Sequence, residues 1–235
     1  MRLRPLLTAA LACALPLTTV VAVGDAVAAQ PGAVRAVPDD CPKPPNEPSG
    51  PYYCNEARFG PAVLPNTEPV ATLLRGYQRF GGLSATHFVK LYAKDDSTWQ
   101  FAPDRGFQKL NGKVDMTQWT VPVGTKLDRF GPLKGGYLSD PGTPFTQRSL
   151  TPDALNPDSD GKAYHCLNVL QEFDVRRGHT AAFFGMPGGG VQEWLDQNLK
   201  PRQLDGQEYK IDVLIKEKYL EVVDDQQCAV TPTGA

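Results

Sequence analysis

The sequence lacks a strong charge of either sign. Its 235 residues include 24 Lys and Arg against 26 Asp and Glu, which gives a formal net charge of −2. Because proteins bind nucleic acid largely through basic residues that contact phosphates, this balance argues against a nucleic-acid-binding module.

Long hydrophobic runs are absent beyond the amino terminus, so we expect no membrane span. Residues 1–29 have a basic start, an apolar run and small residues before Gln30, which is typical of a secretory signal peptide. We therefore expect a secreted, extracellular protein. Loss of this segment removes Arg2, Arg4 and Asp25 and changes the net charge from −2 to −3.

Cysteine is scarce, and one of the five cysteines lies inside the predicted signal peptide. The other four are Cys41, Cys54, Cys166 and Cys228, an even number that predicts two disulfides in an exported chain. Their wide spacing disfavours a zinc site. We favour pairing Cys41 with Cys54 and Cys166 with Cys228, because the first bond would hold a Pro-rich segment with few apolar residues. The sequence alone leaves the other two pairings open.

Glycine and proline are abundant, with 22 of each, which argues against a coiled coil or a helical bundle. Short runs typical of strands occupy 125–130, 136–139, 163–170 and 173–176, and a strand at 219–223 follows a helix predicted at 210–218. The fold class we expect is α+β, with a mixed or antiparallel sheet.

Two helices are predicted before the sheet. One spans 67–80 on the spacing of its apolar residues, and Ser84 caps a shorter one whose face carries Phe88, Leu91 and Tyr92. The predicted organisation is a signal peptide at 1–29, a Pro-rich arm and helical thumb at 30–97, and the main domain at 98–235.

Several common site signatures are missing, including the nucleophile elbow, the zinc-protease helix, the P-loop and the dinucleotide fingerprint. What remains is a set of polar residues in Gly-punctuated, aromatic segments. Arg129 and Arg148 would suit a diphosphate if both faced one cleft. The alternative is that each pairs with a carboxylate such as Asp128 or Asp153.

A second candidate region is 188–192. Three successive glycines, 188–190, permit either a sharp turn or a backbone whose amides face an anion. Gln192 offers a neutral amide that could orient water or a ribose hydroxyl. Phe130, Phe183 and Phe184 could stack on a flat ring or belong to the core.

These segments resemble a known family. The runs LDRFG (127–131), GGYLSDPGTPFTQRSL (135–150) and FFGMPGGGVQ (183–192) are similar to the signature blocks of the tuberculosis-necrotizing-toxin type of NAD glycohydrolase. The front of the chain, with SGPYYC (49–54), RFGPAVLP (58–65), YQRFGGL (77–83) and WQFAPDRGF (99–107), resembles the fungal cell-surface members that carry an amino-terminal thumb.

The resemblance implies an enzyme that cleaves the bond between nicotinamide and ribose in NAD⁺, releasing nicotinamide and ADP-ribose, with NADP⁺ as a second candidate substrate. It assigns catalysis to Gln192 and Arg148. Substrate binding would fall to Arg129, Phe130, Tyr137, Phe183 and Phe184. The chain departs from the family pattern at Phe183, where Trp is common, and at Met186, where Gln is common.

The same resemblance implies that no cofactor is required, a homodimer formed through the thumb, and a calcium site. Candidate calcium ligands lie in 158–161 and at Asp224 and Asp225. Two other functions stay open at this point. One is a secreted ADP-ribosyltransferase, for which Glu193 would supply the carboxylate, and the other is a non-catalytic NAD-binding or adhesion module.

Overall fold

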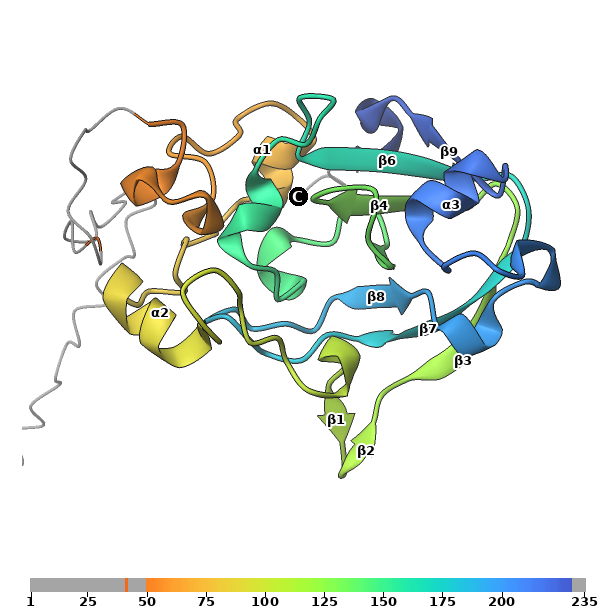
Figure 1. Ribbon diagram of the computed structural model, residues 1–235, viewed down its shortest axis with the longest axis horizontal. Coiled ribbons are helices and arrows are strands. Elements are labelled where there is room, and N and C mark those ends of the chain that lie inside the picture. The colour runs from red at the N-terminus through yellow and green to blue at the C-terminus, as the bar shows by residue number, and fades with distance from the viewer. Residues whose placement is uncertain (1–40, 42–49, 230–235) are drawn as a thin grey trace, which may run out of the picture. The chain divides into compact units, whose positions relative to one another are not determined.

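In the computed structural model, a seven-stranded antiparallel sheet organises the described residues, which are 41 and 50–229 (Figure 1). In sequence order its strands are β3 (Thr117–Val121), β4 (Lys126–Phe130), β5 (Tyr137–Ser139), β6 (Tyr164–Val169), β7 (Phe173–His179), β8 (Val191–Trp194) and β9 (Leu220–Val223). Their order across the sheet is β3-β7-β8-β5-β4-β6-β9. A separate two-stranded hairpin joins β1 (Lys109–Leu110) to β2 (Lys113–Val114). The predicted α+β class is confirmed.

Five of the seven strands of the sheet lie within runs that the sequence predicts. The runs at 125–130, 136–139, 163–170, 173–176 and 219–223 contain β4, β5, β6, most of β7, and β9. The strands β3 and β8 were missed. β3 is an edge strand with mostly exposed side chains, and β8 has four residues directly after three glycines, so neither shows a clear apolar alternation.

The α-helices are α1 (Val70–Leu73), α2 (Ala85–Tyr92) and α3 (Ile211–Lys216). The helix predicted over 67–80 is wrong in length, and Gly76, with a φ of 73°, lies in the left-handed region that a right-handed helix cannot continue through. The second prediction is confirmed at its start, where Ser84 Oγ accepts a hydrogen bond from the His87 amide at 3.2 Å. Leu91, however, is 56% exposed and does not share the buried face of Phe88.

The two faces of the sheet have different roles, because neighbouring residues of a strand point to opposite sides. On one face Leu127, Leu138 and Val175 pack into a hydrophobic core that also includes side chains from α3. The other face carries Asp128 and Gln192, which flank Ser139 across three adjacent strands. The sheet thus separates this apolar core from a face on which buried polar side chains lie beside a second apolar cluster, which includes Phe130, Phe145 and Tyr164.

An aromatic cluster connects the segment before the sheet with the loop before β8. Phe59, Phe80, Phe88 and Trp99 form one buried cluster with Phe184, which is 1% exposed. In the same region the backbones approach closely, and a Cβ on Gly81 would lie 2.3 Å from the carbonyl oxygen of residue 185. The α-helices of this segment, α1 and α2, are short, so the helical thumb and its boundary at 97 remain predictions. The predicted signal peptide lies outside the described residues.

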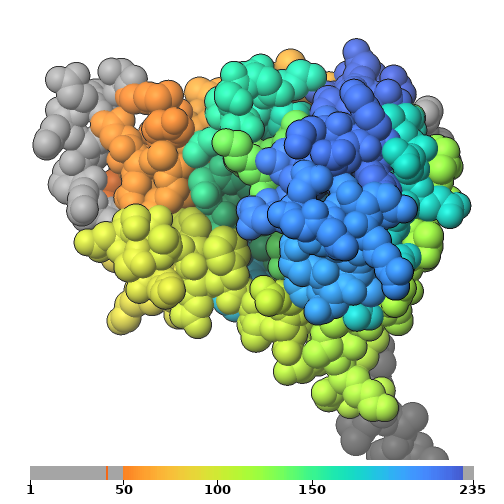
Figure 2. Space-filling view, turned by 45° about the vertical axis from the view of Figure 1, so that its right-hand side comes forward, coloured from red at the N-terminus to blue at the C-terminus, as the bar shows by residue number. Residues whose placement is uncertain are grey.

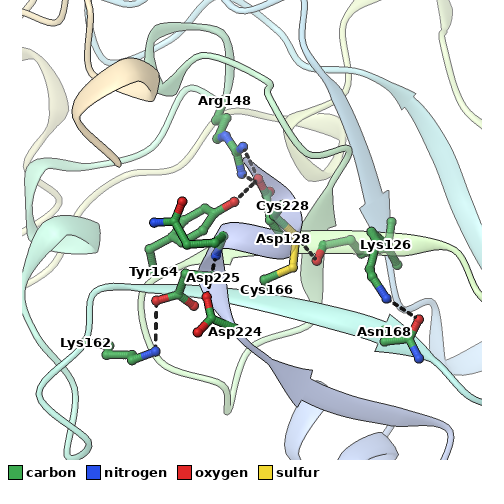
Figure 3. The surroundings of a disulfide bond; sticks show 12 residues. Lys126, Asp128, Arg148, Lys162, Tyr164, Cys166, Asn168, Asp224, Asp225 and Cys228 are labelled. Carbon is green, nitrogen blue, oxygen red and sulfur yellow. Dashed lines mark hydrogen bonds and ion pairs between the residues drawn. A yellow bond between two sulfur atoms is a disulfide. The ribbon is translucent and has the colours of Figure 1, made fainter. Parts of the chain in front are cut away.

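Both favoured disulfides are confirmed. Cys41 bonds to Cys54 and Cys166 bonds to Cys228, with Cα–Cα distances of 5.6 and 5.7 Å. The second bond is buried and joins β6 to the turn that follows β9 (Figure 3). It therefore fastens the end of the described chain to the sheet.

Replacing Cys166 and Cys228 together by alanine should lower the free energy of unfolding by about 4 kcal/mol, because the bond closes a long loop of the unfolded chain. The cysteines are 62 residues apart, against 13 for Cys41 and Cys54. The same change at the shorter pair should cost about 3 kcal/mol. Urea unfolding of both variants measures the difference, and a larger loss for the shorter loop would contradict it.

Candidate active site

A pocket of about 540 Å³ opens on the polar face of the sheet. In Figure 2 the surface is hollowed between the yellow amino-terminal part and the blue carboxyl-terminal part, with green residues at the floor of the hollow. The polar and charged residues that line the pocket are Arg105, Asp128, Arg129, Tyr137, Ser139, Arg148, Ser149, Thr151, Asp153, Thr180 and Gln192. Most of the predicted site residues are therefore brought together in one place.

Gln192 is held in a defined orientation at the inner side of this pocket. It lies on β8, is 8% exposed, and its Nε2 donates a hydrogen bond to the carbonyl oxygen of Arg105 at 3.2 Å. A carbonyl oxygen only accepts hydrogen bonds, so the NH₂ end must face it. The side-chain oxygen Oε1 is the end that remains to accept a hydrogen bond from a ligand.

Arg148 forms a buried ion pair with Asp128. Its Nη1 and Nη2 donate to the two carboxylate oxygens of Asp128 at 2.5 and 2.8 Å, and its Nε donates to the carbonyl oxygen of Thr143 at 2.9 Å (Figure 3). The alternative that Arg148 pairs with Asp128 is therefore the one observed. Within the described residues three of the five guanidinium donors are engaged, which leaves two N–H groups for a ligand.

The Asp128 carboxylate is also bound by Tyr164, whose hydroxyl donates to Oδ2 at 2.8 Å. Burial raises the pKa of the Asp128 carboxyl above its ordinary value, while the charge of Arg148 acts in the opposite direction. Burial also raises the pKa of the Tyr164 hydroxyl. The pocket floor is thus a connected set of polar groups with little exposure to solvent.

Arg129 also borders the pocket, but its guanidinium is occupied differently. Its Nε donates to the carbonyl oxygen of Pro132 at 2.6 Å and its Nη1 to that of Tyr137 at 2.8 Å. A Cβ on Gly135 would meet Nη2 at 2.1 Å, so a larger residue at this position would displace the guanidinium. Burial lowers the pKa of Arg129 to about 10. These contacts assign Arg129 a role in holding the loop between β4 and β5.

The predicted aromatic residues divide into two groups. Phe130, Tyr137 and Phe184 line the pocket, and the guanidinium carbon of Arg148 lies 5.0 Å from the centre of the Phe130 ring. Phe183 is not part of the lining and instead packs against Tyr92 with ring centres 5.2 Å apart. The structure thus places Phe183 in the aromatic cluster.

The three glycines do not present their amides to a ligand. Those of Gly188, Gly189 and Gly190 donate to carbonyl oxygens of residues 146, 180 and 147. A Cβ on Gly190 would lie 2.7 Å from the carbonyl oxygen of Gln147. The anion-binding interpretation is therefore not supported, and these glycines instead allow two backbone segments to pack together beside the pocket.

Sequence reasoning missed several lining residues, notably Arg105 and Ser139. Arg105 belongs to the segment 99–107, which contributes to the family resemblance but for which the sequence predicts no functional residue. Ser139 could have been found from the alternation of side chains along β5, since it lies opposite both Asp128 and Gln192. Arg105 has no such signal, because it lies in an irregular turn with a φ of 60°.

Glu193 lies beside Gln192 in sequence but on the opposite face of the sheet. Its side chain is fully buried and pairs with Arg177, which also binds Asp140. Burial, together with the nearby charge of Asp140, raises the pKa of Glu193 to about 8, while the charge of Arg177 acts in the opposite direction. Because neighbouring strand residues alternate, this carboxyl does not reach the pocket.

The two acidic segments named as calcium candidates lie near each other at the end of β6. Asp225 accepts a hydrogen bond from Lys162 Nζ at 2.8 Å, and Asp160 lies 3.5 Å from Nδ1 of His165. In the part of the chain that the structure describes, no group of three or more His, Cys, Asp or Glu residues is placed to hold a metal ion. Calcium binding remains a prediction. Nor is any helix of the described residues long and apolar enough to cross a membrane.

Comparison with known proteins supports the resemblance read from the sequence. Residues 120–223 match the family model described as tuberculosis necrotizing toxin. The conidial surface nicotinamide adenine dinucleotide glycohydrolase nadA of Aspergillus fumigatus is 39% identical over 153 residues. The match covers 60% of this chain and 63% of that relative, less than two thirds of its length.

Two solved structures are also similar. The tuberculosis necrotizing toxin in complex with its immunity factor IFT is 22% identical, with 73% of this chain and 79% of that chain covered and a TM-score of 0.40. Rhs1-CT in complex with its cognate immunity protein RhsI1 is 12% identical, with 50% and 84% covered and a TM-score of 0.30. Agreement at this level is too loose to place individual residues.

The change Asp128→Asn should lower the free energy of unfolding by about 3 kcal/mol or more, because it leaves the buried Arg148 charge without a counter-charge. Urea unfolding measures the loss. Asp174→Asn is the matched control, since Asp174 also accepts side-chain hydrogen bonds but in an exposed setting. It should cost about 1 kcal/mol. Equal losses in the two variants would contradict the assignment.

The buried Glu193 carboxyl should make stability depend on pH. Its pKa is raised to about 8 in the folded protein from an ordinary value of 4.5, so the folded state retains a proton that the unfolded state loses. Stability should therefore fall by about 2 kcal/mol as the pH rises from about 6.5 to 8. Glu193→Gln should abolish this fall, whereas Glu172→Gln, at an exposed position, should leave it unchanged. Urea unfolding at both pH values measures it; an unaltered fall in Glu193→Gln refutes the assignment.

Proposed function

We propose that this protein is a secreted NAD⁺ glycohydrolase that releases nicotinamide and ADP-ribose from NAD⁺. The observation that carries the proposal is the meeting of Gln192, Arg148, Phe130 and Tyr137 in one pocket. Those residues come from three separated sequence blocks, and the same blocks carry the family resemblance. The similarity to the Aspergillus fumigatus glycohydrolase supports the same activity.

The reaction needs little acid or base from the protein. The bond between the ribose C1′ and the nicotinamide nitrogen breaks with its electron pair going to the nitrogen, so the positively charged ring leaves as a neutral molecule. The ribose then has the character of an oxocarbenium ion, as in the hydrolysis of other glycosides. Water adds to C1′ and releases one proton, which gives ADP-ribose.

The pocket supplies what this reaction requires. The side-chain oxygen of Gln192, whose amide is oriented by the carbonyl of Arg105, accepts a hydrogen bond from a ribose hydroxyl or from the attacking water. The two remaining N–H groups of Arg148 bind oxygen atoms of the substrate. Phe130, fixed by edge contacts with Phe145 at 5.0 Å, provides an apolar wall for the nicotinamide ring.

The alternative of an ADP-ribosyltransferase depends on Glu193. That residue lies on the opposite face of the sheet in an ion pair with Arg177, so it cannot act on a substrate in this pocket. Water is therefore the acceptor in our proposal. A non-catalytic NAD-binding module would have the same pocket. Only a measurement of NAD⁺ cleavage distinguishes it from an enzyme.

Three further parts belong to the proposal. Secretion after removal of residues 1–29 follows from the signal-peptide pattern of that segment, whereas cleavage of NADP⁺ as well as NAD⁺ and a homodimer formed through the thumb follow from the family resemblance. Two disulfides support an extracellular location, because such bonds persist in oxidising compartments.

Gln192→Ala should lower the rate of nicotinamide release from NAD⁺ by about 100-fold or more, because it removes a fixed dipole beside the scissile bond. Its melting temperature should change little, since within the part of the chain that the structure describes the side chain makes one hydrogen bond, to the Arg105 carbonyl. Gln203→Ala is the matched control at an exposed position and should retain full activity. Chromatography of the products checks both.

Two results would overturn the proposal in different ways. If the wild-type protein binds NAD⁺ by calorimetry but releases no nicotinamide, the protein is a binding module. If labelled ADP-ribose becomes attached to protein, it is a transferase. Normal turnover by Gln192→Ala would leave the activity standing and refute the role of this residue.

A further inference from the structure

The mouth of the pocket carries a second set of groups that the chemistry above does not use. Phe101 and Arg105 both line the pocket, and both come from the segment between α2 and the β1–β2 hairpin. They contrast in exposure with the inner residues, because Phe101 is 67% exposed whereas Arg148 is 5% exposed. An exposed ring and an exposed cation thus stand at the mouth of a pocket with a polar floor.

From this arrangement we infer that Phe101 and Arg105 form the subsite for the adenylate half of the substrate. Phe101 stacks on the adenine ring, and Arg105 binds the diphosphate. This inference rests on the proposed function, since it assumes that the nicotinamide riboside half occupies the inner end beside Gln192. The remainder of a dinucleotide must then extend toward the mouth.

Arg105 is suited to a diphosphate because its charge is not neutralised. Within the described residues it forms no ion pair, and the neighbouring Asp104 is paired with Lys109 at 2.8 Å. The other two arginines of the pocket are less available. Arg148 is bound to Asp128, and Arg129, although it forms no ion pair within the described residues either, donates to two backbone carbonyls. A substrate with two negative charges is best served by Arg105, whose exposed guanidinium forms neither an ion pair nor a hydrogen bond within the described residues.

The guanidinium of Arg105 is held in place without losing its charge. Its central carbon lies 4.9 Å from the centre of the Trp194 ring, an arrangement in which the ring face attracts the cation. The carbonyl oxygen of the same residue binds Gln192 at 3.2 Å. Arg105 therefore links the residue beside the scissile bond to the mouth, which is where the phosphates adjoin the ribose.

Phe101 is suited to an adenine ring because it is supported from one side and open on the other. Its ring meets Phe184 edge to face, with ring centres 5.7 Å apart. Phe184 itself is buried in the aromatic cluster and cannot move away. An exposed aromatic ring that is held by a buried neighbour is a good stacking partner for a purine, because stacking uses the faces of the two rings and does not depend on the hydrogen bonds of the purine.

The test uses the full chain and four variants. Phe101→Ala removes the ring, and Arg105→Asn removes the charge while keeping the carbonyl and a residue that tolerates a positive φ. The matched controls are Leu110→Ala and Lys113→Asn, an exposed apolar residue and an exposed lysine of the hairpin, both outside the pocket. Nicotinamide release from NAD⁺ is measured together with inhibition by ADP-ribose and by nicotinamide.

We expect each pocket variant to raise the KM for NAD⁺ and the inhibition constant of ADP-ribose by roughly tenfold, with kcat little changed. Inhibition by nicotinamide should be unchanged, because nicotinamide occupies the inner end only. Both controls should behave as the wild type. This split between two inhibitors is a result that a purely structural role would not give.

Other outcomes decide against the inference and can be told apart from failure of the proposed function. If the wild type releases no nicotinamide, the proposed function itself is wrong. If the wild type is active but KM and ADP-ribose inhibition are unchanged in the variants, the subsite is refuted and the activity stands. If ADP-ribose and nicotinamide weaken equally and the melting temperature falls, these residues act on the fold, and the subsite is again refuted.

Discussion

The buried ion pair between Asp128 and Arg148 is the interaction on which the rest of this site depends. A guanidinium and a carboxylate removed from water are tolerable only when they satisfy each other, so the segment carrying Arg148 must lie against β4 in one position. Tyr164 on β6 binds the same carboxylate, and Cys166, paired across the ladder with Asp128, ties β6 to Cys228. One charged contact thereby fixes three parts of the chain (Figure 3).

The position of Gln192, the catalytic candidate, follows from the way the segment carrying Arg148 is held. The segment leading to Arg148 accepts amide hydrogen bonds from Gly188 and Gly190, and the chain passes from there directly into β8. Gln192 therefore faces the same side of the sheet as Asp128, while Glu193 faces away. The difference between a hydrolase and a transferase in this pocket depends on the alternation of side chains along one short strand.

Much of the fold could be predicted because apolar patterning and cysteine spacing are local or nearly local properties. β4, β6 and α3 follow from runs whose burial matches their sequence. The edge strand β3 escaped prediction because its side chains are mostly exposed, and α1 is shorter than its apolar spacing suggested, with Gly76 in a left-handed turn beyond it. Patterning reports which side chains are buried but not where the backbone turns.

The sequence by itself determined the class of fold, the signature blocks, the favoured disulfides and the residues Gln192 and Arg148 as candidates. Only the tertiary structure decided which partner each polar group would take. In the folded chain Arg148 pairs with Asp128 and the guanidinium of Arg129 binds backbone carbonyls, whereas Arg105 at the pocket mouth forms no ion pair among the described residues. The reason is physical, since an ion pair is a property of distance in space, and residues 20 positions apart in sequence carry no sign that their side chains meet.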